Sequence, residues 1–469
     1  MAVRKYLFVD DRWIAETHAV HRRPGRFEKH PLNPLLVADQ PWEGDCIYCF
    51  GTCLEEGGRF RLWYQVYDSK AEDPRFRTAV GYAESTDGLH WEKPRVGVTH
   101  PRFGATNLVV LSSGVAHLYA PSVIRDDEDP DPARRYKMML WDAMSTEDLA
   151  RHGSPFPKCD DVPGWRGIDG EGLFVLTSSD GIAWRREPRP AIGSPSDASA
   201  FCRLADGSYL AAFKTSERSD HHFRVVAEST SADFAHWSAP RTVLQPDWRD
   251  PIGTEFYGMA PFDYCGNRLG LLWIYHNVPD DKRMDVQLSV WTAIDGWQRA
   301  ADRATMLATG VRGEWDAGLV VTASSLQVSP PGDEGGIWLF YGGGNVRHDD
   351  SRYRRNGIGL ARMRLDGFFG MEAGHFTGSL TLRPMLVPNG DLRLNLSARH
   401  GRCKISIHST GDHRLLARSH VIAGCDDVSV VPTWDLMAAD SWNEVVIVVI
   451  ELQQAVLYGL EVQLPDDAR

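Results

Sequence analysis

Acidic residues recur at one position of a repeated sequence pattern, at the start of the strand that we expect to come first in each repeat. Cleavage of a glycosidic bond needs one carboxylate to attack or stabilise the anomeric carbon, and a second carboxylic acid to protonate the leaving oxygen. Carboxylates that converge raise one another's pKa, which favours the protonated acid at neutral pH. Each residue could instead be a turn or strand-end residue that accepts backbone N–H bonds, and this alternative stays open. The four acidic residues are Asp45, Asp197, Glu255 and Asp316.

Aromatic and polar side chains accompany these carboxylates. In an antiparallel sheet, the start of the first strand and the end of the second lie at the same end, so residues from both should meet in one pocket. Gln65, Asp142 and Asn345 stand at such second-strand ends, and Trp315 is a further aromatic wall. The residues that we predict to bind substrate are Trp42, Tyr119, Lys214, Tyr257, His276 and Asp316.

A turn motif repeats along the chain and indicates the elements that hold these residues. Its copies are Ser85–Trp91, Ser178–Trp184 and Ser231–Trp237, with a shortened copy at Ile294–Trp297 and a degenerate one at Leu365–Phe368. The motif predicts a tight turn in which Asp bonds to the backbone, Gly supplies a positive φ, and the aromatic residue packs under the next strand.

Five aromatic-rich segments precede the copies, and each reads as the second strand of a unit. Repeats of four short strands at periods near 50 residues are typical of a β-propeller. The wider spacing in the second unit predicts an insertion over Ser145–Arg166. The segments are Arg59–Gln65, Arg135–Trp141, Ser208–Lys214, Leu269–His276 and Ile337–Tyr341.

The motif stops after Gly374, where alternating strand-like segments continue without it. About six short strands in the last hundred residues predict a β-sandwich. We therefore predict an all-β chain with very little helix: a five-bladed β-propeller over residues 1–374 and a C-terminal β-sandwich over residues 375–469, with the boundary between Ala373 and Leu380.

Composition narrows the classes of partner. The 469 residues carry a formal net charge of -12, which argues against nucleic-acid and anionic-membrane partners. Neither a signal peptide nor an apolar run long enough for a bilayer is visible, so we expect a cytoplasmic protein. We predict no cofactor and no metal site, because the His221-His222 pair and the His348-Asp349-Asp350 run lack the spacing of a ligand set. The oligomeric state stays open.

The blade order and its carboxylates resemble the five-bladed glycoside hydrolases of the invertase, levansucrase and arabinanase type. The chain is most similar to bacterial hydrolase-like propellers that open as Leu7–Asp11 does and whose fourth blade resembles Gly253–Met259. The resemblance implies that Asp45 is the nucleophile, Asp197 a stabilising carboxylate and Glu255 the acid/base. An axial ion, as in some arabinanase-type propellers, stays open.

The predicted function is hydrolysis of a small carbohydrate or glycoside, fructoside-like or arabinoside-like, by these carboxylates. The apolar neighbours of Glu255 suit a general acid, and the backbone N–H groups near Asp45 suit an ionised nucleophile. Three alternatives remain: a sialidase, a carbohydrate-binding propeller without catalysis, and a propeller recruited to glycosyl transfer, cyclisation or another tailoring step on a metabolite.

Overall fold

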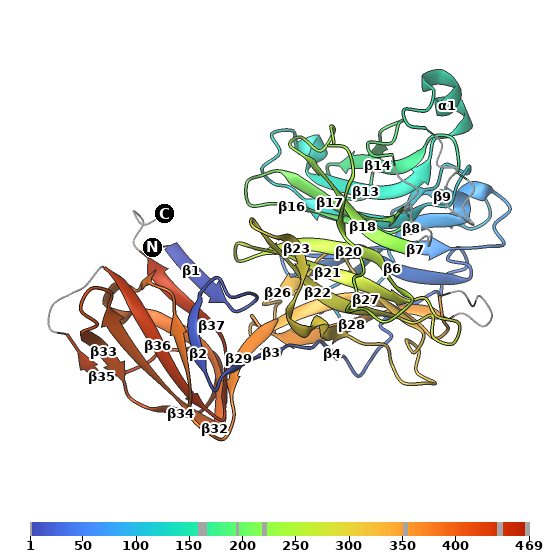
Figure 1. Ribbon diagram of the computed structural model, residues 1–469. Helices are drawn as coiled ribbons and strands as arrows, with labels where there is room; N and C mark the ends of the chain where they lie inside the picture. The colour runs from blue at the N-terminus through green and yellow to red at the C-terminus, as the bar shows by residue number, and fades with distance from the viewer. Residues whose placement is uncertain are drawn as a thin grey trace.

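The computed structural model describes residues 2–157, 167–193, 197–217, 223–348, 350, 355–438 and 444–464. Within these ranges the chain is built almost entirely of strands, and α1 (Thr146–His152) is the one α-helix. It stands off the second blade, in the described part of the predicted insertion (Figure 1). The prediction of an all-β chain with very little helix is confirmed.

The first three blades are four-stranded antiparallel sheets, each formed by consecutive strands except for a short separate hairpin in the first. From the inner to the outer strand they are β6 (Cys46–Glu56), β7 (Arg59–Tyr67), β8 (Thr78–Ser85) and β11 (Leu108–Leu111); β12 (Tyr119–Arg125), β13 (Tyr136–Ala143), β14 (Glu171–Ser178) and β15 (Arg185–Arg186); and β16 (Ser199–Arg203), β17 (Tyr209–Glu217), β18 (Phe223–Ser231) and β19 (Arg241–Leu244). The separate hairpin is β9 (Thr99–His100) with β10 (Gly104–Ala105).

The last two blades are joined by a single parallel pairing, Met284 with Leu319. Blade 4 contains β20 (Thr254–Tyr264), β21 (Asn267–His276), β22 (Met284–Thr292), β23 (Gly296–Arg299) and β24 (Thr305–Leu307). Blade 5 contains β25 (Leu319–Thr322), β26 (Gln327–Val328), β27 (Gly336–Gly344) and β28 (Asn356–Arg364), with β4 (Glu28–Lys29) and β5 (Leu36–Val37) on its outer edge.

The ring closes because N-terminal strands complete the last blade: β4 and β5 both pair with β28. Strand β6 of blade 1 contacts both β12 of blade 2 and β25 of blade 5, so blade 1 lies between its two neighbours in the ring. All five predicted aromatic segments lie in the second strands of their blades. The predicted five-bladed propeller is confirmed.

The repeated turn connects the third and fourth strands of a blade. In blade 2, Asp180 Oδ1 accepts the backbone N–H groups of Ile182 at 2.8 Å and of Ala183 at 2.9 Å, and Gly181 has φ +76°. Equivalent carboxylate bonds form at Asp87 and Asp233. The predicted turn geometry is therefore present in all three full copies.

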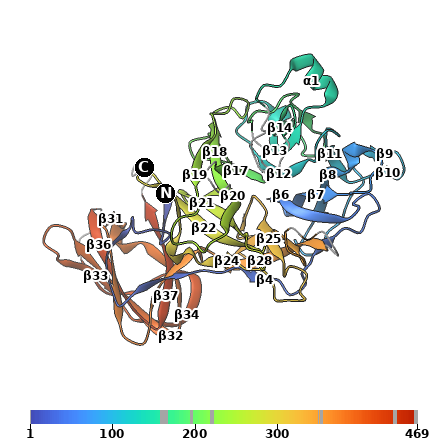
Figure 2. The same ribbon diagram turned by 45° about the vertical axis from the view of Figure 1, so that its right-hand side comes forward.

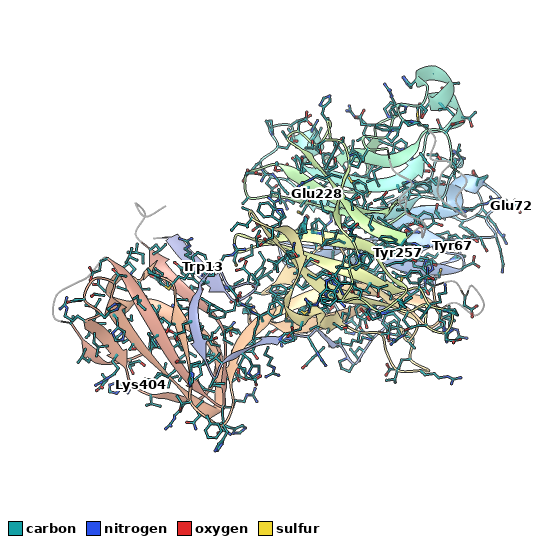
Figure 3. All side chains as sticks on the ribbon, in the orientation of Figure 1. Trp13, Tyr67, Glu72, Glu228, Tyr257 and Lys404 are labelled. Atoms are coloured by element: carbon teal, nitrogen blue, oxygen red, sulfur yellow. The ribbon has the colours of Figure 1, made fainter. Side chains whose placement is uncertain are left out.

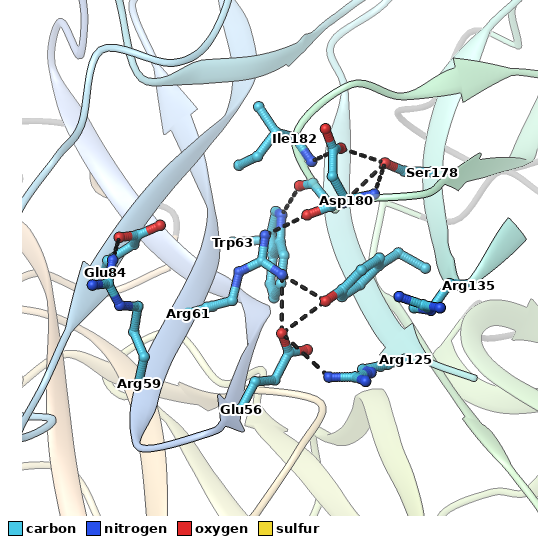
Figure 4. Close-up of polar contacts among 12 residues, drawn as sticks. Glu56, Arg59, Arg61, Trp63, Glu84, Arg125, Arg135, Ser178, Asp180 and Ile182 are labelled. Carbon is cyan, nitrogen blue, oxygen red and sulfur yellow. Dashed lines mark hydrogen bonds and ion pairs between the residues drawn. The ribbon is translucent and has the colours of Figure 1, made fainter. Parts of the chain in front are cut away.

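These turns also join neighbouring blades. The Asp180 carbonyl accepts a hydrogen bond from Arg61 Nη2 at 2.5 Å, and the Gly181 carbonyl accepts one from Trp63 Nε1 at 2.8 Å. Figure 4 shows this junction, with Arg61 and Trp63 of β7 facing the turn of the next blade. Glu56, which pairs with Arg61 at 3.0 Å, extends the same network.

The C-terminal body is a β-sandwich, separate from the blades in both views (Figure 1 and Figure 2). Its long strand β32 pairs with β37 through its first half and with β36 through its second. On its other edge β32 pairs with β34, where the register shifts between Ala398 and Arg402. The strands are β1 (Ala2–Leu7), β2 (Ile14–His18), β3 (His21–Pro24), β29 (Phe369–Ala373), β30 (Gly378–Leu382), β31 (Met385–Leu386), β32 (Leu392–Ser409), β33 (Leu415–Ser419), β34 (Ile422–Val430), β35 (Trp434–Met437), β36 (Val445–Gln453) and β37 (Ala455–Leu464).

The first three strands of the chain belong to this sandwich, since β1 pairs with β37, β2 with β30 and β3 with β29. Strand β29 also pairs with β37. The chain thus starts in the sandwich, passes through the propeller and returns. The domain boundary between residues 374 and 375 stays a prediction. Strand pairing groups residues 2–24 and 369–373 with the C-terminal strands.

In the described part of the chain, four short 3-10 helices interrupt the connections: η1 (Pro74–Phe76), η2 (Pro132–Arg134), η3 (Ala301–Arg303) and η4 (Pro388–Gly390). No helix among the described residues is long and apolar enough to cross a bilayer.

Candidate functional site

A cavity of about 260 Å³ lies at the end of the propeller where the inner strands begin. Tyrosine and phenylalanine rings from blades 1, 2 and 4 dominate its wall, and Asp197 is the carboxylate among its described lining residues. Tyr67 and Tyr257, labelled in Figure 3, come from blades 1 and 4. The lining residues are Tyr48, Phe50, Gln65, Tyr67, Tyr119, Asp197, Tyr257, Met284, Leu319, Val321 and His348.

Asp197 is held by Lys214, whose ammonium forms an ion pair with its carboxylate. The side chains are 23% and 12% exposed, respectively, so the pair is largely screened from water. The Lys214 Nζ also lies 4.1 Å from the centroid of the Tyr257 ring, where a cation is attracted to the π face. Burial lowers the pKa of Lys214, and the charge of Asp197 opposes this shift.

Glu255 lies behind Tyr257 and is 5% exposed. Its Oε2 accepts hydrogen bonds from Arg224 Nη1 at 2.5 Å and from the Arg224 backbone N–H at 3.3 Å, while its Oε1 accepts one from Asn277 Nδ2. The Arg224 guanidinium is 5.6 Å from the Tyr257 centroid. A chain of contacts therefore links Asp197 to Glu255 through Lys214, Tyr257 and Arg224, although Glu255 is not among the described residues that line the cavity.

Asp45 stands at the same end of the propeller, just before β6. It is exposed, and its Oδ2 accepts the backbone N–H of Ser69 at 2.7 Å. Its own N–H donates to the carbonyl of Tyr67, a lining residue, at 2.9 Å. Asp45 is thus adjacent to the cavity but outside its described lining. Its carboxylate accepts a backbone N–H, as in the alternative that these acidic residues are strand-end residues bonded to the backbone.

Trp42 and Asp316 are buried in contacts of their own. Trp42 is 3% exposed, and its indole N–H donates to Asn107 Oδ1 at 2.7 Å. Asp316 is 1% exposed, pairs with Lys29 at 2.6 Å and accepts the Tyr341 hydroxyl at 2.9 Å. Both lie outside the described lining, because these partners hold them within the packing of blades 1 and 5.

Tyr119 lines the cavity, as expected for an aromatic wall. His276 does not line it within the described residues; its Nε2 is 2.8 Å from Asp285 Oδ2. That hydrogen bond is the main cause of the raised pKa of His276. Of the predicted residues, the structure therefore places Tyr119, Asp197 and Tyr257 on the cavity wall and Lys214 directly beside them.

Several lining residues were missed by the sequence analysis. Tyr48 and Phe50 lie two residues apart on β6, and Leu319 and Val321 are likewise two apart on β25, so each pair shares one face. This alternation along the inner strands was the available signal. His348 follows β27 in a loop, and its Nε2 is 2.8 Å from the Tyr257 hydroxyl oxygen.

No group of three or more His, Cys, Asp or Glu side chains suited to a metal ion occurs in the described part of the chain. His221-His222 and Asp349, considered above as metal ligands, lie outside the described residues.

Comparison with known proteins gives distant structural similarity. No protein-family model matches the chain, and no curated protein matches it in sequence. The solved structures to which the chain is similar include glycoside hydrolases. The chain is similar to the N-acetylgalactosamine deacetylase from F. plautii solved with blood group B trisaccharide (16% identity, 75% of this chain and 97% of that one, TM-score 0.47). A glycosyl hydrolase from Bacteroides ovatus gives 15% identity, 72% and 94% coverage and a TM-score of 0.46.

A third similar structure covers more of this chain. It is a family 43 arabinoxylan arabinofuranohydrolase from Bacillus subtilis, with 12% identity, coverage of 93% of this chain and 99% of that one, and a TM-score of 0.43. Similarity at these identities and TM-scores carries no further conclusion about this chain. The chemistry of this site rests on its own residues.

Proposed function

We propose that the chain is a glycosidase that binds one sugar ring of a small carbohydrate or glycoside in the axial cavity and hydrolyses the bond beside that ring. The observation that carries this proposal is the cavity wall, on which aromatic rings surround the Asp197 carboxylate. The volume of about 260 Å³ is below that of pockets for drug-sized ligands, roughly 300 Å³ and above, and suits a single ring. Fructosides and arabinosides are the first substrates to test.

The roles follow from what each carboxylate must do. Asp197 faces the ring and is positioned to contact the reacting centre or its hydroxyls. Glu255 must release Arg224 and Asn277 before it can donate a proton, because both of its oxygens already accept hydrogen bonds. Asp45 must turn away from the Ser69 N–H to attack a ring in the cavity.

Carbohydrate binding without cleavage is the second candidate, and a specific observation favours it. The two inner carboxylates, Asp197 and Glu255, are both paired with cations, Lys214 and Arg224. Ion pairs of this kind are as suitable for holding a fixed binding surface as for acid/base chemistry.

The test is hydrolysis of chromogenic aryl glycosides, with fructosides and arabinosides in the panel, by the wild type and by Asp197→Asn, Glu255→Gln and Asp45→Asn. We expect Asp197→Asn to lower kcat/KM by about 100-fold or more. Asp126→Asn is the matched control, since Asp126 is likewise paired with a lysine, Lys137 at 3.0 Å, but follows the far end of β12. It should leave kcat/KM near the wild-type value.

The outcomes separate the candidates. If no glycoside in the panel is cleaved and sugars still bind, the binding function replaces the glycosidase. If Asp197→Asn and Asp126→Asn lose activity equally, the loss reflects stability and Asp197 has no special role. Glu255→Gln should spare activated aryl glycosides, whose leaving oxygen needs no proton, if Glu255 is the acid.

A further inference from the structure

Gln65 is a buried amide on the wall of the axial cavity. It lies on β7, is 1% exposed, and faces Tyr48 of β6 across the sheet. Its Oε1 accepts the backbone N–H of Ala120 at 3.0 Å. Because that N–H can only donate, the atom facing it must be the amide oxygen. The orientation of the Gln65 amide is therefore fixed by a neighbouring blade.

The other end of this amide has no partner among the described residues. No described residue accepts a hydrogen bond from Gln65 Nε2, although the atom is buried. Buried polar groups in folded proteins almost always find a partner, so an unpaired donor on a cavity wall indicates an acceptor that arrives with a ligand.

The residue that orients Gln65 is itself strained. Ala120 has φ +52°, in the left-handed region that residues with a Cβ rarely adopt. It follows the lining residue Tyr119, in a stretch of β12 where the register shifts before Ser122. Backbone strain of this kind is concentrated at ligand sites, where the surrounding structure maintains it for a purpose. Here the strained N–H serves the amide that lines the cavity.

The charges around the cavity restrict the ligand. Asp197, on the same wall, offers an acceptor for a hydroxyl, and its charge is balanced by Lys214. A ligand with its own net charge would bring an unbalanced charge into a site already neutralised by this pair, which is costly in a screened cavity. Among its described residues, the cavity thus presents the oriented Gln65 amide, the Asp197 carboxylate balanced by Lys214, and aromatic faces.

We propose that Gln65 Nε2 donates a hydrogen bond to a ring or hydroxyl oxygen of the ligand, and that the ligand is a non-ionic sugar ring rather than a uronic acid or an amino sugar. This inference rests on the proposed carbohydrate function of the cavity. It adds a specificity-determining residue, Gln65, and a positioning residue, Ala120, and it names the charge class of the sugar.

The experiment measures binding by titration calorimetry, independently of hydrolysis. The probes are the methyl glycosides of xylose, galactose, arabinofuranose and fructofuranose, with glucuronic acid and glucosamine as the charged counterparts. The variants are Gln65→Glu, which replaces the donor by an acceptor of the same shape, and Gln65→Met, which removes it. Gln327→Glu is the matched control: Gln327 is 6% exposed and donates to the Cys53 carbonyl at 2.6 Å, away from the described lining.

We expect the wild type to bind at least one neutral glycoside more tightly than either charged sugar. Both Gln65 variants should weaken that binding by about 10- to 100-fold, and Gln327→Glu should not. If Gln65→Glu does not fold, as judged by near-UV circular dichroism, Gln65→Met carries the test. Unchanged affinity in the Gln65 variants overturns the proposal, as does failure of the wild type to bind any neutral probe or tighter binding of a charged one.

These results are distinguishable from failure of the glycosidase proposal. Neutral-sugar binding that depends on Gln65, without hydrolysis of any aryl glycoside, supports this inference and overturns catalysis. Hydrolysis that survives both Gln65 substitutions with unchanged KM supports catalysis and overturns this inference.

Discussion

Replacing Asp180 by alanine should destabilise the propeller through one turn. The carboxylate Oδ1 accepts hydrogen bonds from the Ser178 hydroxyl at 2.9 Å and from two backbone N–H groups, those of Ile182 at 2.8 Å and Ala183 at 2.9 Å. Each such bond contributes about 0.5 to 1.5 kcal/mol, and the turn is exposed enough for water to replace part of it. We expect the free energy of unfolding to fall by about 2 kcal/mol.

A matched control exists in the shortened copy of the motif. Asp295 occupies the same place in sequence, but the only donor to its carboxylate among the described residues is the Thr292 hydroxyl at 3.4 Å. Asp295→Ala should therefore cost less than about 0.5 kcal/mol. Urea unfolding at pH 7, followed by tryptophan fluorescence, measures both variants.

The dependence on pH gives a second check on the same reasoning. Although burial works to raise the pKa of Asp180, the N–H groups of Ala183 and Ile182 lower it overall. A carboxyl whose pKa is lowered in the folded state adds stability above its unfolded value, about 3.8, and loses it as the pH falls through the folded value. The difference between wild type and Asp180→Ala should shrink below about pH 4. Equal costs for Asp180→Ala and Asp295→Ala, or a difference that grows in acid, would refute the argument.

Two further predictions concern charged pairs near the site. The pKa of His276 is raised, mainly by its hydrogen bond to Asp285, so this residue adds stability below its unfolded pKa of about 6.5 and loses it as the pH rises through the folded pKa. His276→Gln should therefore flatten the decline in melting temperature above about pH 6.5. An unchanged slope contradicts this. Asp316→Asn leaves Lys29 without its carboxylate partner and should lower the free energy of unfolding by about 2 to 3 kcal/mol, less than for a fully buried pair because Lys29 is 26% exposed; a urea midpoint equal to that of the wild type would show that the pair contributes no net stability.

Local sequence determined the blades. The Ser-x-Asp turns predict their own geometry because every bond that forms them lies within a few residues, from Ser178 to Ala183 in blade 2. The aromatic second strands could be found for a similar reason, since a strand buried on both faces reads as an apolar run in sequence. Five turns and five such strands were enough to predict the number of blades.

Tertiary structure alone decided which residues meet. Asp45, Asp197 and Glu255 lie at the starts of their inner strands, yet among the described residues Asp197 is the one of the three that lines the cavity. The difference lies in partners that are distant in sequence: Arg224 and Asn277 hold Glu255, and the Ser69 N–H holds Asp45. No local pattern shows which cation or N–H will reach a given carboxylate.

The closure of the ring and the orientation of the site both depend on contacts between residues distant in sequence. Strands β4 and β5 pair with β28 to complete blade 5, and β1–β3 pair with strands of the C-terminal sandwich more than 300 residues away along the chain. The orientation of the Gln65 amide is likewise fixed by Ala120, 55 positions later, whose backbone N–H donates to the amide oxygen. The sequence alone thus determined the repeated unit, because its bonds are local, and the tertiary structure decided the chemistry of the cavity, because every contact that orients a polar group there comes from another strand.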